Sequence, residues 1–411
     1  MSQRVLSRLF LLAAAIASAA ACSELDNTAT NVQLKPQQNA FANGLASTGW
    51  HAQARALVAA NVQSPLVAGR VYAALGVAQY AAVDDVARLS SEDGTIPDNG
   101  FGKGGRARYE AERGAVAGAS VRVLSFFYPA AATTLEQRVD TEANAGAGEV
   151  HPAFTRGVAI GRAAGDWMVT RLQSDRFTTP WTGTIPTGPG IFIPNGPPAG
   201  PQLGAVMPYF LTAGDQFRPA PPPAFGSATF NTELAEIKTL SDTRTPQQLA
   251  IAQKWNYGNG TYTPPGYWNE LASELIQENG LNEREATHVF ALMGAAGFDA
   301  LIGCWNAKYY YWLIRPWQAQ AGITLPIGAP NHPSYPSGHS CVSSATASVL
   351  ADFFPSEATN LNAQIAEAGL SRMYGGIHFR SDISAGERLG RSTAQHAIDI
   401  DKQQGLLSVL R

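Results

Sequence analysis

The chain has 411 residues, of which 45% are hydrophobic and only 15% are charged, and its formal net charge is −3. A chain of this length can bury a large core, either as one big helical domain or as two or three smaller domains. Its charges form no basic stripe and no long block of one sign, which argues against nucleic acid as a partner.

Residues 1–22 resemble an export signal. An apolar run from Leu9 to Ile16 is too short to span a bilayer, and small residues continue to Cys22. The sequence ASAAAC at 17–22 resembles a bacterial lipoprotein processing site, which predicts lipidation of Cys22; a plain secretory signal is the alternative. We therefore expect an exported protein of the bacterial cell envelope, held to a membrane only through that lipid, or a secreted one. The polar residues 23–45 favour a tether.

An N-terminal helical region is expected over residues 46–230. Apolar residues recur at helical spacing from Trp50 to Leu89, and Pro65 divides this pattern into two helices. Further helices are predicted at 104–127, 130–145 and 153–174. Residues 177–225 hold twelve of the chain's 26 prolines, together with aromatic residues that disordered linkers usually lack. They predict a long ordered excursion without regular structure, with a plain linker as the alternative.

A C-terminal helical bundle is expected over residues 231–405. Helices are predicted at 231–240, 246–254, 266–279, 283–314, 338–354, 358–371 and 380–403. Strand signals are almost absent, so the fold class is mainly α, a multi-helix bundle. No segment after the signal offers eighteen uninterrupted apolar residues, and we expect a body that does not span a membrane. Cys304 and Cys341 lie in apolar helical contexts, which favours buried free thiols over a disulfide.

Three short stretches in the last quarter of the chain concentrate cations and imidazoles. In the first, KYYYWLIRPW, Lys308 and Arg315 are seven residues apart, which predicts that both lie on one face of a helix. Such a face can present two positive charges to one anion. The alternative is an ordinary helix end whose cations reach into solvent.

The second stretch, PSGH, is typical of a helix start that meets an anion. Ser337 offers a hydroxyl, and Gly338 lets the backbone N–H approach a ligand without an intervening side chain. His339 titrates near neutrality and can give and take protons. A capped helix with a satisfied histidine is the alternative.

The third stretch, SRMYGGIHFRSD, contains Arg372 and a histidine followed four residues later by a carboxylate. If His378 opens a helix, this spacing lets Asp382 hold one ring nitrogen and leaves the other free. A surface ion pair is the alternative for this stretch alone. Taken together, the cations, the donors at the helix start and the two imidazoles predict a site for a tetrahedral oxyanion.

These stretches read Lys-x6-Arg-Pro, Pro-Ser-Gly-His and Ser-Arg-x5-His-x3-Asp. In this they resemble the superfamily of vanadium-dependent haloperoxidases and type 2 phosphatidic acid phosphatases, which includes the bacterial nonspecific acid phosphatases. The resemblance covers residues 305–382 without a departure in residue type or in spacing within the motifs. The rest of the chain agrees with this superfamily only as an α-helical sequence.

The resemblance implies a role for each motif residue. His378 is expected to be the apical ligand of vanadate or, in a phosphatase, the nucleophile that becomes phosphorylated. His339 is expected to be the acid or base on the opposite side, and Asp382 to orient His378. The residues expected to bind the equatorial oxygens are Lys308, Arg315, Ser337, Gly338 and Arg372. Bound vanadate is shaped like the transition state of phosphoryl transfer, so the motifs alone do not choose between the two reactions.

Two positions outside the motifs favour the haloperoxidase. Trp305 lies one helical turn before Lys308, where haloperoxidases have a Trp beside the cofactor, and His332 lies where bromide-oxidising members carry a histidine. The alternatives are a core indole and a loop histidine. The prediction is therefore a vanadate-dependent enzyme that uses hydrogen peroxide to oxidise bromide or iodide, rather than chloride, for an organic acceptor. The alternative is a soluble acid phosphatase without a cofactor, which hydrolyses a phosphate ester through a phosphohistidine.

Overall fold

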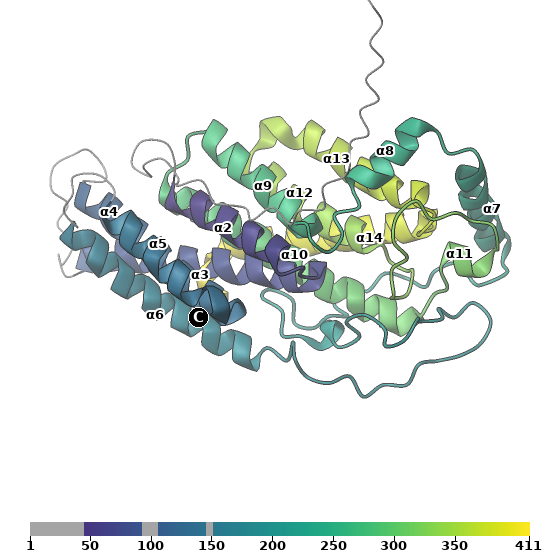
Figure 1. Ribbon diagram of the computed structural model, residues 1–411, viewed down its shortest axis with the longest axis horizontal. Helices are drawn as coiled ribbons and strands as arrows, with labels where there is room; N and C mark the ends of the chain where they lie inside the picture. Colours follow the sequence, from purple (N-terminus) through teal and green to yellow (C-terminus); the bar gives the residue numbers. More distant parts are fainter. Residues whose placement is uncertain (1–44, 93–105, 145–150) are drawn as a thin grey trace, which may run out of the picture. The chain divides into compact units, whose positions relative to one another are not determined.

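The computed structural model describes residues 45–92, 106–144 and 151–411 (Figure 1). The predicted export signal, the lipidation of Cys22 and nearly all of the predicted tether lie outside these residues. Within them, helices follow one another and the only extended pairings are isolated bridges, Ile191 with Leu313 and Asn259 with Thr261. The prediction of a mainly α, multi-helix fold is confirmed.

The first helices are α2 (Ala46–Ala60), α3 (Pro65–Glu92), α4 (Arg106–Phe127), α5 (Ala132–Asn144) and α6 (Pro152–Ser174). Helices α4 and α6 approach each other closely because glycines line their contact. A Cβ on Gly114 would lie 2.1 Å from the Phe154 carbonyl oxygen, and one on Gly157 would lie 2.0 Å from that of Ala111. Only glycine permits backbones to pack at this separation.

The excursion runs from the end of α6 to the start of α7 (Ala228–Asp242) and contains a single short 3₁₀ turn, Leu203–Ala205. It is anchored on the bundle by a buried carboxylate. Asp299 accepts hydrogen bonds from the backbone N–H groups of Tyr209, Phe210 and Leu211 at 2.8, 2.7 and 3.1 Å. Burial raises the pKa of this carboxyl to about 6. Three donors to one carboxylate hold this part of the segment in place.

The remaining helices are α7 (Ala228–Asp242), α8 (Pro246–Lys254), α9 (Thr263–Glu278), α10 (Glu283–Tyr311), α11 (Pro316–Ala319), α12 (Gly338–Phe353), α13 (Ala358–Tyr374), α14 (Arg380–Gln404) and α15 (Leu406–Leu410). Helix α10 packs against α3, α12 and α14 (Figure 1). It begins with a capping box between Asn282 and Glu285.

Among the residues that the structure describes, two segments are long and apolar enough to cross a membrane by length and composition. They are Pro65–Leu89 and Glu283–Tyr311, and their most apolar windows are 89% and 94% buried inside the fold. This burial is typical of core helices. Cys304 and Cys341 are buried and free, as predicted.

Candidate oxyanion-binding site

The three motif stretches meet where α10 ends and where α12 and α14 begin. One prediction about them is wrong, because Lys308 and Arg315 do not share a helix face. Helix α10 ends at Tyr311, Trp312 has a left-handed φ of 51°, and Arg315 is extended, with ψ 152°, as the N-cap of α11. Proline disfavours the helical conformation for the residue that precedes it, and Arg315 precedes Pro316, so Arg315 does not continue the helix. Both cationic side chains are nevertheless fully buried.

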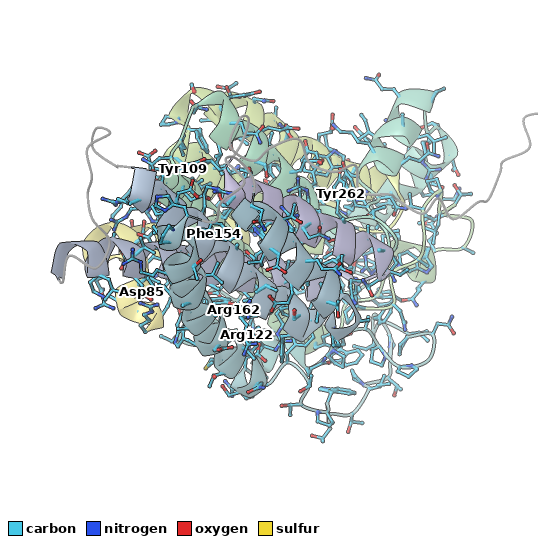
Figure 2. All side chains as sticks on the ribbon, turned by 60° about the vertical axis from the view of Figure 1, so that its left-hand side comes forward. Asp85, Tyr109, Arg122, Phe154, Arg162 and Tyr262 are labelled. Atoms are coloured by element: carbon cyan, nitrogen blue, oxygen red, sulfur yellow. The ribbon has the colours of Figure 1, made fainter. Side chains whose placement is uncertain are left out.

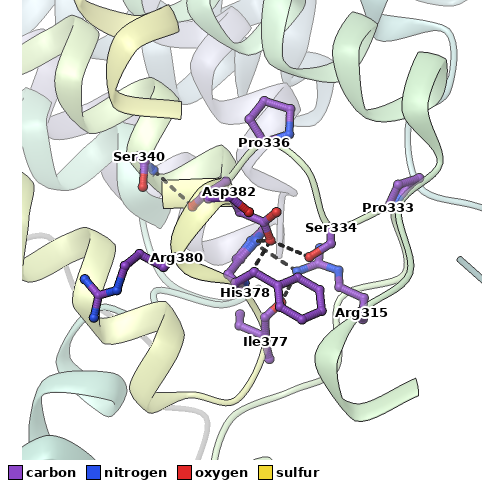
Figure 3. A network of polar contacts seen from close by, with 12 residues as sticks. Arg315, Pro333, Ser334, Pro336, Ser340, Ile377, His378, Arg380 and Asp382 are labelled. Atoms are coloured by element: carbon purple, nitrogen blue, oxygen red, sulfur yellow. Dashed lines mark hydrogen bonds and ion pairs between the residues drawn. The ribbon is translucent and has the colours of Figure 1, made fainter. Parts of the chain in front are cut away.

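The His378 ring is held from both sides. Its Nδ1 donates to Oδ2 of Asp382 at 2.8 Å, and its Nε2 accepts from Nη1 of Arg315 at 3.1 Å (Figure 3). The hydroxyl of Ser334 donates to the same Oδ2 at 2.5 Å, and so does the backbone N–H of Phe379 at 3.0 Å. His378 precedes α14 by two residues instead of opening it. The carboxylate still fixes the proton on Nδ1 and leaves the lone pair on Nε2.

Arg315 joins two loops of the site. Its Nε donates to the carbonyl of His332 at 3.0 Å, and its Nη1 donates to the carbonyl of Ile377 at 2.6 Å. Its Nη2 contacts Nδ1 of His332 at 3.0 Å. The guanidinium therefore positions both His332 and the loop that carries His378, in addition to supplying charge.

Lys308 lies in the last turn of α10, and its ammonium group points at the loop before α12. It donates to the carbonyls of Pro333 and Ser334 at 3.0 and 2.9 Å, and to that of Pro336. Burial lowers its pKa to about 8. Lys308 thus shapes the loop that leads into Ser337, a role that its sequence motif did not indicate.

Ser337 and Gly338 form the start of α12. Ser337 is the N-cap, and its hydroxyl accepts from the backbone N–H of Ser340 at 3.3 Å, while its own N–H donates to the Asp382 carbonyl at 2.9 Å. A Cβ on Gly338 would lie 3.1 Å from the six-membered ring of Trp305. The glycine therefore lets the indole lie against the helix start.

His339 and Arg372 are both anchored on the end of α8 and the loop that follows. Nε2 of His339 donates to the Trp255 carbonyl at 2.8 Å, and Nη2 of Arg372 donates to the Ala252 carbonyl at 3.1 Å. Burial and the Arg372 charge hold the pKa of His339 well below its usual value. The imidazole is therefore neutral, and its Nδ1 carries no hydrogen.

Trp305 and His332 lie together beside this cluster. Their ring centroids are 5.0 Å apart, and the ammonium of Lys308 is 5.6 Å from the indole centroid. Burial, followed by the charges of Lys308 and Arg315, lowers the pKa of His332. The imidazole of His332 thus lies next to an indole and two cations, which disfavour its protonation.

The charges of the site are unbalanced in a way that fits an oxyanion. Burial lowers the pKa of Arg315 and of Arg372 to about 9, and Asp382 is the carboxylate whose charge opposes this for Arg315 and Lys308. Arg372 has no carboxylate partner among the described residues, and Oδ1 of Asp382 has no hydrogen bond there. Buried cations are tolerated when a counter-charge meets them. A tetrahedral oxyanion such as vanadate or phosphate would supply that charge.

Residues 286–404 match the model of the PAP2 superfamily, and this segment contains all three motif stretches. This segment is therefore similar to the PAP2 superfamily. Members of the PAP2 superfamily are enzymes, either haloperoxidases or phosphatases. A comparison with curated proteins gave no match.

Several solved structures share the fold over 84–86% of this chain. A bacterial vanadium-dependent iodoperoxidase has a TM-score of 0.71 and 24% identity, over 86% of this chain and 95% of that one. The apo and holo forms of a bacterial vanadium-dependent chloroperoxidase have TM-scores of 0.65 and 0.63 at 17% and 16% identity. Each covers 84% of this chain, and the alignments span 94% and 93% of those chains. The fold around the PAP2 segment is thus that of the vanadium haloperoxidases.

The structure adds residues to the site that the sequence did not indicate. Ser334 lies two residues before the PSGH stretch, and a hydroxyl three residues before Ser337 belongs to no recognisable spacing. Trp255 lies 84 residues before His339 and contributes a backbone carbonyl, which has no side-chain signal at all. Tertiary folding alone brings these groups to the motif residues.

Proposed function

We propose that this protein is a vanadium-dependent haloperoxidase that uses hydrogen peroxide to oxidise bromide or iodide to hypohalous acid. The observation that carries the proposal is the packing of Trp305 and His332, with ring centroids 5.0 Å apart, at the edge of the buried cationic cluster. The likeness to vanadium haloperoxidases over 84–86% of the chain supports it, and one of those proteins is an iodoperoxidase.

Vanadate would be held by Nε2 of His378 and by donors from the residues that surround it, namely Lys308, Arg315, Ser337, Gly338 and Arg372. When bound, it supplies an electrophilic centre that activates hydrogen peroxide toward a halide. Asp382 keeps the proton on Nδ1 of His378, so the lone pair of Nε2 faces the cluster. His339 accepts a proton from the incoming peroxide at its bare Nδ1 and can return it to a leaving oxygen.

Reconstitution with orthovanadate tests the proposal. The metal-free protein is loaded with vanadate and assayed for bromination of a freely diffusing acceptor in the presence of peroxide and bromide, beside hydrolysis of a phosphate ester. We expect halogenation that requires all three components. Ester turnover that vanadate inhibits, without halogenation, would assign the alternative instead, a phosphatase that works through a phosphohistidine at His378.

Two variants separate the proposed roles of the histidines. We expect His378→Ala to lose vanadate binding, because the ligand nitrogen is gone. His339→Ala is expected to bind vanadate but to be inactive, because the proton acceptor is gone. Vanadate binding can be followed by equilibrium dialysis. An equal loss of binding in both variants contradicts this division of roles.

We further propose that the protein is exported and lipid-anchored through Cys22. The support is the apolar run followed by small residues up to this cysteine. Metabolic labelling with a radioactive fatty acid tests it. Label should enter the natural protein and be absent from Cys22→Ser, and an unlabelled, freely released natural protein refutes the anchor.

A further inference from the structure

An open cavity of about 390 Å³ lies between the excursion and the last turns of α10. Four aromatic side chains line it, Trp181 from the excursion and Trp305, Tyr309 and Tyr310 from α10. Trp181 lies 6.5 Å from Tyr309, centroid to centroid, so the two elements close around one space. The volume falls in the range of roughly 300–1,000 Å³ that small-molecule sites occupy.

Two arginines give this aromatic cavity a positive charge. Arg218 is fixed, because its Nε and Nη2 donate to Oδ1 of Asn306 at 3.0 and 2.7 Å and its guanidinium lies 4.0 Å from the Tyr310 ring centroid. Among the described residues it forms an ion pair with Asp215, whose Oδ2 lies 3.6 Å from Nη2 of Arg218 and whose side chain is largely exposed. Arg176 is exposed, and its guanidinium makes no hydrogen bond or ion pair with the residues that the structure describes. No acidic side chain is among the described residues that line the cavity.

The backbone at Arg176 shows that this residue is held in an unusual conformation. Its φ is 69°, in the left-handed region that non-glycine residues rarely adopt. Strained residues of this kind cluster at ligand sites, where the surrounding structure holds them in place. Arg176 follows Asp175, whose carboxylate is bound by Arg70 at 2.7 Å, and this ion pair fixes the start of the turn.

The Trp305 indole joins this cavity to the oxyanion site. It lines the cavity, donates its N–H to the Ala199 carbonyl at 3.1 Å, and presses its six-membered ring against the start of α12 at Gly338. A molecule in the cavity therefore lies across one indole from the donors that surround the candidate anion site. Trp181, Arg176 and Arg218 have no role in the candidate oxyanion site.

We propose that this cavity binds a planar aromatic carboxylate, which is the organic acceptor of the oxidised halogen. The ring packs between the Trp and Tyr faces, and the carboxylate meets the two guanidinium groups, an arrangement that carboxylate and arginine geometry favours. The acceptor role rests on the proposed function. In that step the C–X bond forms as the X–O bond of hypohalous acid breaks, and the ring proton leaves with the hydroxide as water.

Binding is tested first, on the protein without vanadate, by calorimetric titration with 4-hydroxybenzoate. We expect saturable binding, and weaker binding of 4-hydroxybenzamide, which has the same shape and no charge. Arg176→Gln should weaken the binding of the acid about tenfold or more, because it removes a charged hydrogen bond. The control is Arg122→Gln, which removes the same charge from the exposed α4–α6 pair with Asp166 (Figure 2) and should change nothing.

Absence of binding, equal affinity for the acid and the amide, or an Arg176→Gln variant that binds as tightly as the natural protein overturns the proposal. The acceptor role is tested next on the vanadate-loaded enzyme, with bromide and peroxide. We expect the KM for bromination of 4-hydroxybenzoate to lie below that of the amide by the ratio of their affinities. Equal KM values refute the acceptor role. Tight binding without any oxidation of bromide refutes the proposed function and leaves the binding site standing.

Discussion

His378 and Asp382 are joined through Nδ1 and Oδ2 at 2.8 Å, and both side chains are almost completely buried. The fold contains a second pair of the same chemistry, in which Nε2 of His288 lies 2.9 Å from the Asp401 carboxylate. That pair is partly exposed, with 26% of the His288 side chain and 11% of the Asp401 side chain accessible to solvent. The two pairs therefore allow the effect of a histidine–carboxylate contact to be separated from the effect of its surroundings.

Replacement of Asp382 should weaken the binding of the oxyanion. In Asp382→Asn the side chain keeps its size and loses the charge that fixes the proton on Nδ1 of His378. Partners that orient a ligating histidine typically contribute 10–100-fold to affinity, so we expect orthovanadate to bind about 10–100-fold more weakly. Equilibrium dialysis measures this, with phosphate as a second probe. Asp401→Asn is the matched control, and an equal loss there contradicts the specific role of Asp382.

Removal of the Asn331 side chain should loosen the excursion. Its Nδ2 donates to the carbonyls of Asn195 and Pro197 at 2.9 and 2.8 Å, and its Oδ1 accepts from the Asn195 N–H at 2.8 Å. Asn331→Ala loses all three bonds, and we expect faster cleavage between residues 177 and 225 in limited proteolysis. Asn362→Ala removes an exposed amide elsewhere and should leave the digestion pattern unchanged. An unaltered cleavage rate in Asn331→Ala would show that other contacts are sufficient to hold the excursion in place.

Glu283 should make stability depend on pH. Its two carboxylate oxygens cap α2 by accepting from the N–H groups of Ala46 and Ser47 at 2.8 Å, and burial raises its pKa to about 7. Between its ordinary pKa, near 4.5, and 7 the folded protein binds the proton more tightly than the unfolded chain, so the free energy of unfolding falls as pH rises. The free energy of unfolding falls by about 3 kcal/mol over this range, and the loss is complete above pH 7.

The variant Glu283→Gln isolates this effect. Glutamine does not titrate, so the difference in unfolding free energy between the natural protein and the variant should change with pH between 4.5 and 7 and become constant above 7. Urea titrations at several pH values measure it. A constant difference for Glu283→Gln would show that the fold does not raise the pKa of the Glu283 carboxyl.

A methyl group at the α4–α6 contact should destabilise the fold. In Gly157→Ala the new Cβ would meet the Ala111 carbonyl oxygen at 2.0 Å, so the helices must separate. Overpacking of this kind costs about 1–3 kcal/mol or more, and we expect a clear drop in Tm by calorimetry. Gly328→Ala is the control, because a Cβ there meets nothing within 4 Å. A Tm equal to that of the natural protein would mean that α4 and α6 adjust at no cost.

Most helices could be predicted from the sequence because their apolar residues follow a 3.6-residue period. The end of α10 could not, since Trp312, Leu313 and Ile314 continue the apolar pattern beyond Tyr311. In the structure the excursion takes the hydrogen bonds of these residues: Phe192 N–H donates to the Trp312 carbonyl, and the Ile314 N–H donates to that of Gly190, at 2.8 and 2.9 Å. A partner more than a hundred residues away thus overrides the local preference.

The candidate site shows the same division. The motif residues could be named from their types and spacing, because side chains that bind an anion are chemically distinctive. Their supports could not be named, since Lys308 is held by the carbonyls of residues 333, 334 and 336 and His339 by that of Trp255. A backbone carbonyl is present at every position of a chain, so its use leaves no trace in the sequence.

The excursion, which lines the cavity, is attached to the bundle through Asp299 and Asn331, and neither residue belongs to the candidate oxyanion site. Both residues bind backbone groups of the excursion, which every amino acid possesses, so this attachment does not depend on which side chains the excursion carries. Relatives with other residues in this segment would line the cavity differently, while the residues of the candidate oxyanion site stay the same. Exchange of residues 177–198 between such proteins is therefore a route to new acceptor selectivity.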